Sequence, residues 1–189
     1  MKILFLIVLV FALTSACNFS CFQSSCRTTG GSGERCQCTT LTDRGVTRYH
    51  AMCTARGATS CEKTDDLTGC SIHGNNAQCT LTRRTSGAAT WYVSYCQANS
   101  ASRCSQKLAG SNCEVVGENA RCTTGILSYR GAPWIVPLCQ ADRALQCSVN
   151  CGTSACDRDC TGTGKRADCH CFVQSSKTQV FLSAKCNCV

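Results

Sequence analysis

The sequence predicts an all-β, small disulfide-rich protein made of four tandem β-hairpin repeats of about 43 residues, with little helix, stacked as an array. The chain holds 22 cysteines in 189 residues, and their spacing recurs four times. β-Branched and aromatic residues precede the last cysteine of each repeat, as in strands. Cysteine at this density in a secreted chain indicates a disulfide framework. Because only 6% of the residues are aromatic, cross-links rather than a large apolar core should hold the fold together.

Residues 1–16 are expected to be a secretory signal peptide. Lys2 precedes an apolar run of about ten residues, and small residues follow at 14–16. The run is too short to cross a bilayer, and no later segment reaches the roughly 20 apolar residues that crossing needs, so no membrane span is predicted. The mature chain would begin at Cys17 and contain every cysteine. We therefore expect a secreted, extracellular protein, either free or associated with a wall or matrix.

Most of the cysteines fall into four rows with shared spacing. Eight residues separate the first and second cysteines of each row, sixteen separate the third and fourth, and seven link one row to the next. The rows are cysteines 17, 26, 36, 53; 61, 70, 79, 96; 104, 113, 122, 139; and 147, 156, 169, 186. A fixed period of this kind indicates one supersecondary unit that has been multiplied. The predicted repeats 1 to 4 span 17–60, 61–103, 104–146 and 147–189.

Each sixteen-residue gap is predicted to be a β-hairpin with a cysteine at each end. Thr-rich or apolar residues follow the third cysteine, turn-forming residues come next, and strands such as TWYVSYC and PWIVPLC lead to the fourth. A glycine five positions before the third cysteine predicts a tight turn or a close backbone approach. This glycine is Gly31, Gly74, Gly117 or Gly164. The linkers keep alanine at their second and fifth positions, a spacing that suits a short helical turn.

The remaining cysteines lie in the first and last repeats. Two pairs occupy equivalent positions in those repeats and are absent together from the central ones, so each pair is expected to form a bridge. The predicted extra bridges are Cys21–Cys38, Cys151–Cys171 and, by exclusion, Cys160–Cys188. Terminal units of a repeat protein lack a neighbour on one side. Extra cross-links at both ends therefore favour a stacked array.

The four row cysteines of each repeat allow three pairings. We first expect the third cysteine to pair with the fourth, across the ends of the hairpin. The bridges predicted in this way are Cys36–Cys53, Cys79–Cys96, Cys122–Cys139 and Cys169–Cys186. Each disulfide typically contributes about 2–4 kcal/mol to stability, so oxidation should be a condition of folding.

The sequence predicts neither an enzyme nor a cofactor. The three histidines lie at different repeat positions, and no nucleophile elbow, phosphate-binding loop or HExxH motif occurs. No metal site is predicted, because thiolate ligands need a reducing compartment. Without Lys2, 18 Lys and Arg face 11 Asp and Glu, a formal net charge of +7. This scattered charge favours loose attraction to anionic surfaces, and no nucleic-acid partner is predicted.

The best indication of function is a recurring aromatic residue. It lies four or five positions before the fourth cysteine of every repeat. The predicted ligand-binding residues are Trp91, Tyr92 and Trp134, with Tyr49 and Phe181 extending the row. Flat rings stack on the apolar faces of sugars, so the first-choice function is that of a lectin, a carbohydrate-binding protein for wall or matrix polysaccharide. The alternative is that the rings pack between neighbouring repeats, because the central strands are apolar on both faces.

Two further function classes remain open. Arginine beside glycine at 44–45, 56–57 and 130–131 would suit a braced loop that blocks a trypsin-like protease, or a toxin acting on another protein. A structural component of an extracellular coat, wall or shell would need no ligand. Asn18 begins the sequon Asn18-Phe19-Ser20 and is a candidate N-glycosylation site.

Overall fold

The computed structural model describes residues 16–43, 45–176 and 179–189. Within these ranges every regular element is a β-strand, and every strand pair is antiparallel. The prediction of an all-β, disulfide-rich fold is therefore confirmed. The expected signal peptide lies outside the described residues except for Ala16. The described part of the chain contains no helix that could cross a membrane.

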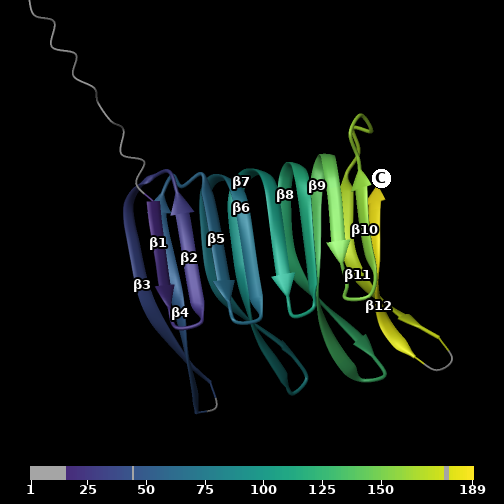
Figure 1. Ribbon diagram of the computed structural model, residues 1–189, viewed down its shortest axis with the longest axis horizontal. Coiled ribbons are helices and arrows are strands. Elements are labelled where there is room, and N and C mark those ends of the chain that lie inside the picture. Colours follow the sequence, from purple (N-terminus) through teal and green to yellow (C-terminus); the bar gives the residue numbers. More distant parts are fainter. Residues whose placement is uncertain (1–15, 44, 177–178) are drawn as a thin grey trace, which may run out of the picture.

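The strands follow the chain in an almost unbroken series. They are β1 (Ala16–Cys21), β2 (Ser24–Thr29), β3 (Ser32–Asp43), β4 (Val46–Arg56), β5 (Ser60–Asp65), β6 (Thr68–Ser86), β7 (Ala89–Leu108), β8 (Ser111–Tyr129), β9 (Ala132–Asn150), β10 (Ala155–Asp159), β11 (Ala167–Ser175) and β12 (Val180–Cys188). One sheet has the order β1-β2-β5-β6-β7-β8-β9-β11-β12, with β10 on β9, and β3 pairs separately with β4. Figure 1 shows the repeats succeeding one another along the long axis of the molecule.

Each repeat contains two hairpins. The first hairpin carries the first two cysteines, and the first hairpins of successive repeats pair edge to edge along the array. The second hairpin carries the third and fourth cysteines and forms a second layer, whose turns extend past the lower edge of the array (Figure 1). Side chains on first-hairpin strands alternate between buried and exposed, as Cys61 and Glu62 do. The second layer therefore covers one face of the first.

The long strands β6 to β9 bend where they pass from one layer to the other. Register shifts interrupt the β6–β7 and β8–β9 pairs at these bends. Asn76 and Asn119, three positions before the third cysteines, have φ values of 54° and 50°. Ser100 and Arg143, four positions after the fourth cysteines, have φ values of 47° and 40°. Left-handed residues at repeated positions thus make the two corners of each central repeat.

The repeated glycine and the linker alanines fit against each other. A Cβ atom on Gly74 would lie 2.7 Å from Ala101 Cα, and one on Gly117 would lie 2.8 Å from Ala144 Cα. Glycine is therefore required by close backbone approach. The predicted helical turn in the linkers is wrong, because the central linkers belong to β7 and β9 and their alanines leave room for the bend. Gly164, in the repeat with the longest second gap, has no such contact within 4 Å.

Eleven disulfides connect the cysteines, and the three extra bridges form as predicted: Cys21–Cys38, Cys151–Cys171 and Cys160–Cys188. In every repeat the first row cysteine pairs with the third and the second with the fourth. These bridges are Cys17–Cys36, Cys26–Cys53, Cys61–Cys79, Cys70–Cys96, Cys104–Cys122, Cys113–Cys139, Cys147–Cys169 and Cys156–Cys186. The predicted third-to-fourth bridges Cys36–Cys53, Cys79–Cys96, Cys122–Cys139 and Cys169–Cys186 are therefore wrong.

The layered architecture explains why the row cysteines pair in this way. Cys79 and Cys96 are direct cross-strand partners, as the prediction assumed. Both side chains point toward the first hairpin, and each is bonded to a cysteine there. A bridge between Cys79 and Cys96 would join strands that are already hydrogen-bonded to each other. The observed bridges instead hold one layer on the other, with buried cysteine, alanine and a few larger side chains such as Ile72 and Val115 between them.

Candidate functional site

The structure divides the predicted aromatic residues between the two faces of the second hairpins. Tyr49 and Tyr92, four positions before the fourth cysteine, lie on the face that carries the cysteines. Trp91, Trp134 and Phe181, five positions before it, lie on the opposite face. The five rings therefore do not form one continuous row.

The rings on the cysteine face make contacts within the molecule. Tyr49 stacks on Phe22, with ring centroids 4.3 Å apart. The guanidinium carbon of Arg48 lies 5.9 Å from the Tyr92 ring centroid. Partial burial raises the pKa of Tyr92, and a hydrogen bond to Asp43 adds to the effect. Tyr92 therefore helps to hold the second hairpin of repeat 2 against that of repeat 1.

The opposite face is packed at its base and opens toward the turns. Val93 and Val136 are buried, although they share this face with Trp91 and Trp134. Trp91 is partly buried, whereas Trp134 and Phe181 are each 37% exposed. In the central repeats, the face opposite the cysteines thus contributes to packing near the cysteines. Closer to the turns it leaves Trp134 accessible.

A cleft of about 290 Å³ lies between the second hairpins of repeats 2 and 3. Tyr95 and Gln97 of β7 line one side. Arg121 and Thr123 of β8, with Gln140 of β9, line the other. An aromatic ring, two amides, a hydroxyl and a guanidinium provide the mixture of apolar surface and hydrogen-bonding groups that orients a polar ligand.

A polar chain extends from this cleft across three strands. Arg121 Nε donates to Gln140 Oε1 at 3.2 Å. Gln140 Nε2 donates to Asp168 Oδ1 at 3.4 Å, and His170 Nδ1 lies 3.3 Å from the same oxygen. On the other side, Arg84 Nη2 is 3.5 Å from Thr123 Oγ1. These contacts fix the side chains that face the cleft.

The sequence pattern did not predict this cleft, because the aromatic residues that recur lie four and five positions before the fourth cysteine. Tyr95 is directly before that cysteine, on the same strand face as Trp91. A signal was present, since only repeat 2 has an aromatic residue there, but no sequence pattern showed that Arg121 and Gln140 of the next repeat would lie opposite.

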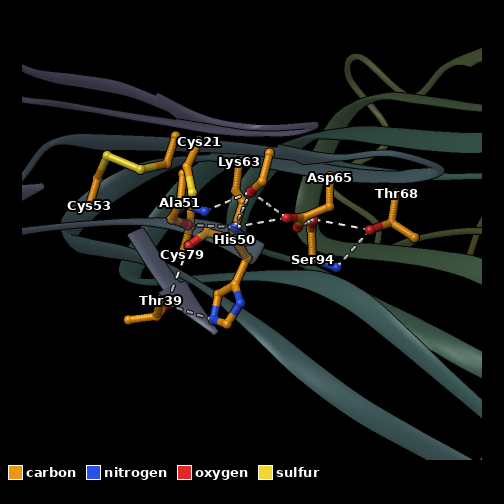
Figure 2. Close-up of polar contacts among 12 residues, drawn as sticks. Cys21, Thr39, His50, Ala51, Cys53, Lys63, Asp65, Thr68, Cys79 and Ser94 are labelled. Carbon is orange, nitrogen blue, oxygen red and sulfur yellow. Dashed lines mark hydrogen bonds and ion pairs between the residues drawn. A yellow bond between two sulfur atoms is a disulfide. The ribbon is translucent and has the colours of Figure 1, made fainter. Parts of the chain in front are cut away.

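A second polar cluster is buried where repeat 2 meets repeat 1, and Figure 2 shows its contacts. The Lys63 side chain is fully buried. Its Nζ donates to Ala51 O at 2.6 Å, Ser24 Oγ at 3.2 Å and Asp65 Oδ1 at 3.1 Å. Ser94 Oγ donates to the other oxygen of Asp65 at 2.6 Å. This cluster connects strands β2, β4, β5 and β7.

Burial controls the electrostatics of this cluster. It lowers the pKa of Lys63, and the Asp65 carboxylate partly opposes that shift. Burial also lowers the pKa of His50, with the Lys63 charge adding to the effect and Asp65 opposing it. His50 Nε2 is 2.8 Å from Thr39 Oγ1, while its Nδ1 has no hydrogen-bond partner.

A lysine beside a serine hydroxyl is one arrangement that activates a nucleophile. Here Ser24 is only 3% exposed and Lys63 is inaccessible, so a substrate has no route to the pair. The cluster instead joins the first and second repeats through hydrogen bonds from Lys63 to Ser24 and Ala51, while the Lys63–Asp65 ion pair lies within β5.

One hydrogen bond of this cluster recurs at equivalent positions of other repeats. A hydroxyl residue stands two positions before the second cysteine of every repeat, as Ser24, Thr68, Ser111 or Ser154. In three repeats it accepts a hydrogen bond from the backbone N–H two positions before the fourth cysteine. The bonds run from Ala51 N to Ser24 Oγ (2.8 Å), Ser94 N to Thr68 Oγ1 (3.0 Å) and Ala184 N to Ser154 Oγ (3.0 Å). Repeat 3 has Pro137 at the donor position, which has no N–H.

The other residues considered from the sequence lie at the surface or within bridges. Asn18 is exposed on β1. Arg130 and Gly131 form a tight turn with φ values of 50° and 78°. An inhibitory loop that adds to a partner as a strand would need an extended backbone instead. Arg44 lies outside the described residues. The sulfur atoms of Cys70, Cys79 and Cys96 lie within 4.8 Å of one another, but all three belong to disulfides and are not thiolates.

The fold and the cleft define the chain as a disulfide-rich array of β-hairpins with a polar cleft between its central repeats. Comparison with known proteins found no matching family model, no matching curated protein and no matching solved structure.

Proposed function

We propose that the protein is a secreted, non-enzymatic carbohydrate-binding protein, and that its main binding site is the cleft between the second hairpins of repeats 2 and 3. The observation that carries this proposal is the position of Tyr95 opposite Arg121, Thr123 and Gln140 in that cleft. A sugar presents an apolar ring face and several hydroxyls, and therefore requires both an aromatic surface and fixed polar partners. The many disulfides support an extracellular location.

The array suits an extended polysaccharide of a wall or matrix. Successive repeats advance by two strands, which is about 9.6 Å in the hydrogen-bonding direction. This spacing is comparable with the length of a disaccharide unit in an extended β-1,4-linked glycan. Trp91 and Trp134 occupy equivalent positions of the two hairpins that form the cleft. They would extend the contact with the polysaccharide toward the turns. We therefore include both tryptophans in the proposed site as secondary binding residues.

The structure gives less support to a protease inhibitor, because the exposed Arg130 sits in a left-handed turn. A coat or shell component is the remaining alternative, and bridges between the layers in every repeat would suit such a role. A structural component of this kind would resist extraction until a reductant is added. It would show no dependence on Tyr95.

Retention on insoluble cellulose, chitin and a pectin gel tests the proposal. Wild type should be retained on at least one of these glycans, and Tyr95→Ala should weaken that retention roughly tenfold, the effect of losing about 1.4 kcal/mol. Tyr129→Ala, which removes a tyrosine from the turn of the second hairpin of repeat 3, is the matched control and should bind like wild type. Wild type that stays in the supernatant with all three glycans and also fails to bind a sulfated glycan would overturn the proposal.

A further inference from the structure

One guanidinium group lines the cleft, and a second lies beside a residue that lines it. Arg121 lines its β8 side, and Arg84 extends from β6 to Thr123 on the same strand. Arg121 and Thr123 are two residues apart and share one face of β8, with a separation of about 6.7 Å along the strand. The Arg84 guanidinium, from the second hairpin of repeat 2, therefore lies at the edge of the cleft beside Thr123, while Arg121 of repeat 3 lines the cleft itself.

Neither guanidinium has a carboxylate partner among the described residues. Several other arginines do: the ion pairs are Arg83–Asp43, Arg103–Glu114 and Arg143–Glu118. The acid closest along the polar chain from the cleft is Asp168, which Arg121 reaches only through the amide of Gln140 and which also contacts His170. One cation in the cleft and a second at its edge, without acids to balance them, create a site for a negatively charged group.

Arg84 also has a donor that no protein group satisfies. Its Nε atom is buried and has no hydrogen-bond partner, although Arg84 is only partly buried as a whole. A buried donor without a protein acceptor is uncommon in folded proteins, and an ion or a water molecule is one way to satisfy it. The planar fork of arginine matches the oxygens of a carboxylate or a sulfate through two parallel hydrogen bonds.

We infer that the cleft selects an anionic glycan, with Arg84 and Arg121 binding a carboxylate or sulfate group while Tyr95 contacts the sugar ring. This inference rests on the proposed function and specifies its ligand class. Uronic acids and sulfate esters share the required chemistry, which is a compact anion attached to a sugar ring. The formal net charge of +7 that remains without Lys2 adds a general attraction to such polymers.

Binding of the oxidised, full-length protein to three soluble polymers tests this inference. Polygalacturonate supplies carboxylates, dextran sulfate supplies sulfates, and unmodified dextran supplies neither. At about 150 mM salt, where long-range attraction between exposed charges is largely screened, wild type should bind at least one anionic polymer ten times more tightly than dextran. Which anionic polymer it prefers identifies the group that the guanidiniums bind.

The variants separate a specific site from general attraction. Arg84→Gln should lose about tenfold in affinity for the preferred anionic polymer, whereas Arg130→Gln, which removes the same charge from an exposed turn, should lose less than twofold. Equal losses in both variants, or equal binding of dextran and the anionic polymers, would overturn the inference. Equal binding that still depends on Tyr95 would leave the proposed function intact. Unchanged thermal midpoints in both variants show that they remain folded.

Discussion

At the junction of repeats 1 and 2, the buried Lys63 extends from the first layer to the carbonyl oxygen of Ala51 in the second layer. At the junction of repeats 3 and 4, the two equivalent positions are occupied by Val149 and Pro137, and both side chains are buried. One junction thus holds an ion and its hydrogen-bond partners in a place where the other holds only apolar groups.

The middle junction is intermediate. Gln106 takes the position of Lys63 and donates to Ser94 O at 3.0 Å and Gly69 O at 3.2 Å. The same position therefore holds an ammonium, an amide and an isopropyl group in successive junctions. The same disulfides and strand pairs form around each of these three groups. Since buried ion pairs often stabilise a fold no better than apolar side chains do, the frame of the array depends on its bridges and not on the chemistry of this position.

The largest effect is expected from breaking the polar junction. Asp65→Ala removes the carboxylate partner of Lys63, and loss of one partner from a buried ion pair typically costs about 3–5 kcal/mol. Equilibrium unfolding in guanidinium chloride, with the disulfides intact, should show a loss of this size. Asp66→Ala, one residue further on and exposed, should unfold like wild type.

Converting the polar junction into the chemistry of repeat 3 provides the complementary test. The double variant Lys63→Gln/Asp65→Leu copies Gln106 and Leu108, which hold the equivalent positions. It removes both charges together, so its stability should return to within about 1 kcal/mol of wild type. A double variant as unstable as Asp65→Ala would show that the junctions are not interchangeable.

A smaller effect is expected at the repeated hydroxyl. Ser154→Ala removes the acceptor for the Ala184 N–H and should cost about 1 kcal/mol, the usual net contribution of a hydrogen bond. Ser111→Ala is its counterpart in repeat 3, where Pro137 offers no N–H, and should have less than half that effect. Equal losses in the two variants would contradict the assignment of this bond as the stabilising contact.

The smallest effect concerns pH and is confined to the polar junction. Burial lowers the pKa of His50 in the folded state, whereas in the unfolded chain it should be near 6.5. The unfolded chain therefore binds this proton more readily, and stability falls as pH drops below about 6.5. His50→Gln should reduce the loss of stability between pH 7 and pH 5, and the exposed His73→Gln should not; identical pH profiles in wild type and His50→Gln would contradict this.

Cysteine spacing was sufficient to predict the second hairpin of each repeat, the repeat period and the three extra bridges, but not the first hairpin. It could not predict the pairing of the row cysteines, because Cys79 and Cys96 do lie opposite each other on paired strands. The presence of a second layer decides their partners, and nothing in the local pattern distinguishes a strand that covers another hairpin from one that stands alone.

The candidate sites were harder to predict for a related reason. Lys63 resembles a surface charge in a polar stretch, and only strand alternation together with a covering layer makes it buried. The cleft depends on Tyr95 from one repeat and Arg121 from the next, which meet only in the folded array. Contacts between repeats leave little trace in the pattern of any single repeat.

The central claim is that disulfides in every repeat fasten the second hairpin to the first. Trypsin applied to unreduced, denatured protein would place the four row cysteines of repeat 3 in separate peptides, 104–107, 108–121, 122–130 and 131–143. Mass spectrometry should find 104–107 bonded to 122–130 and 108–121 bonded to 131–143. A bonded pair of 122–130 with 131–143 would contradict the two-layer account.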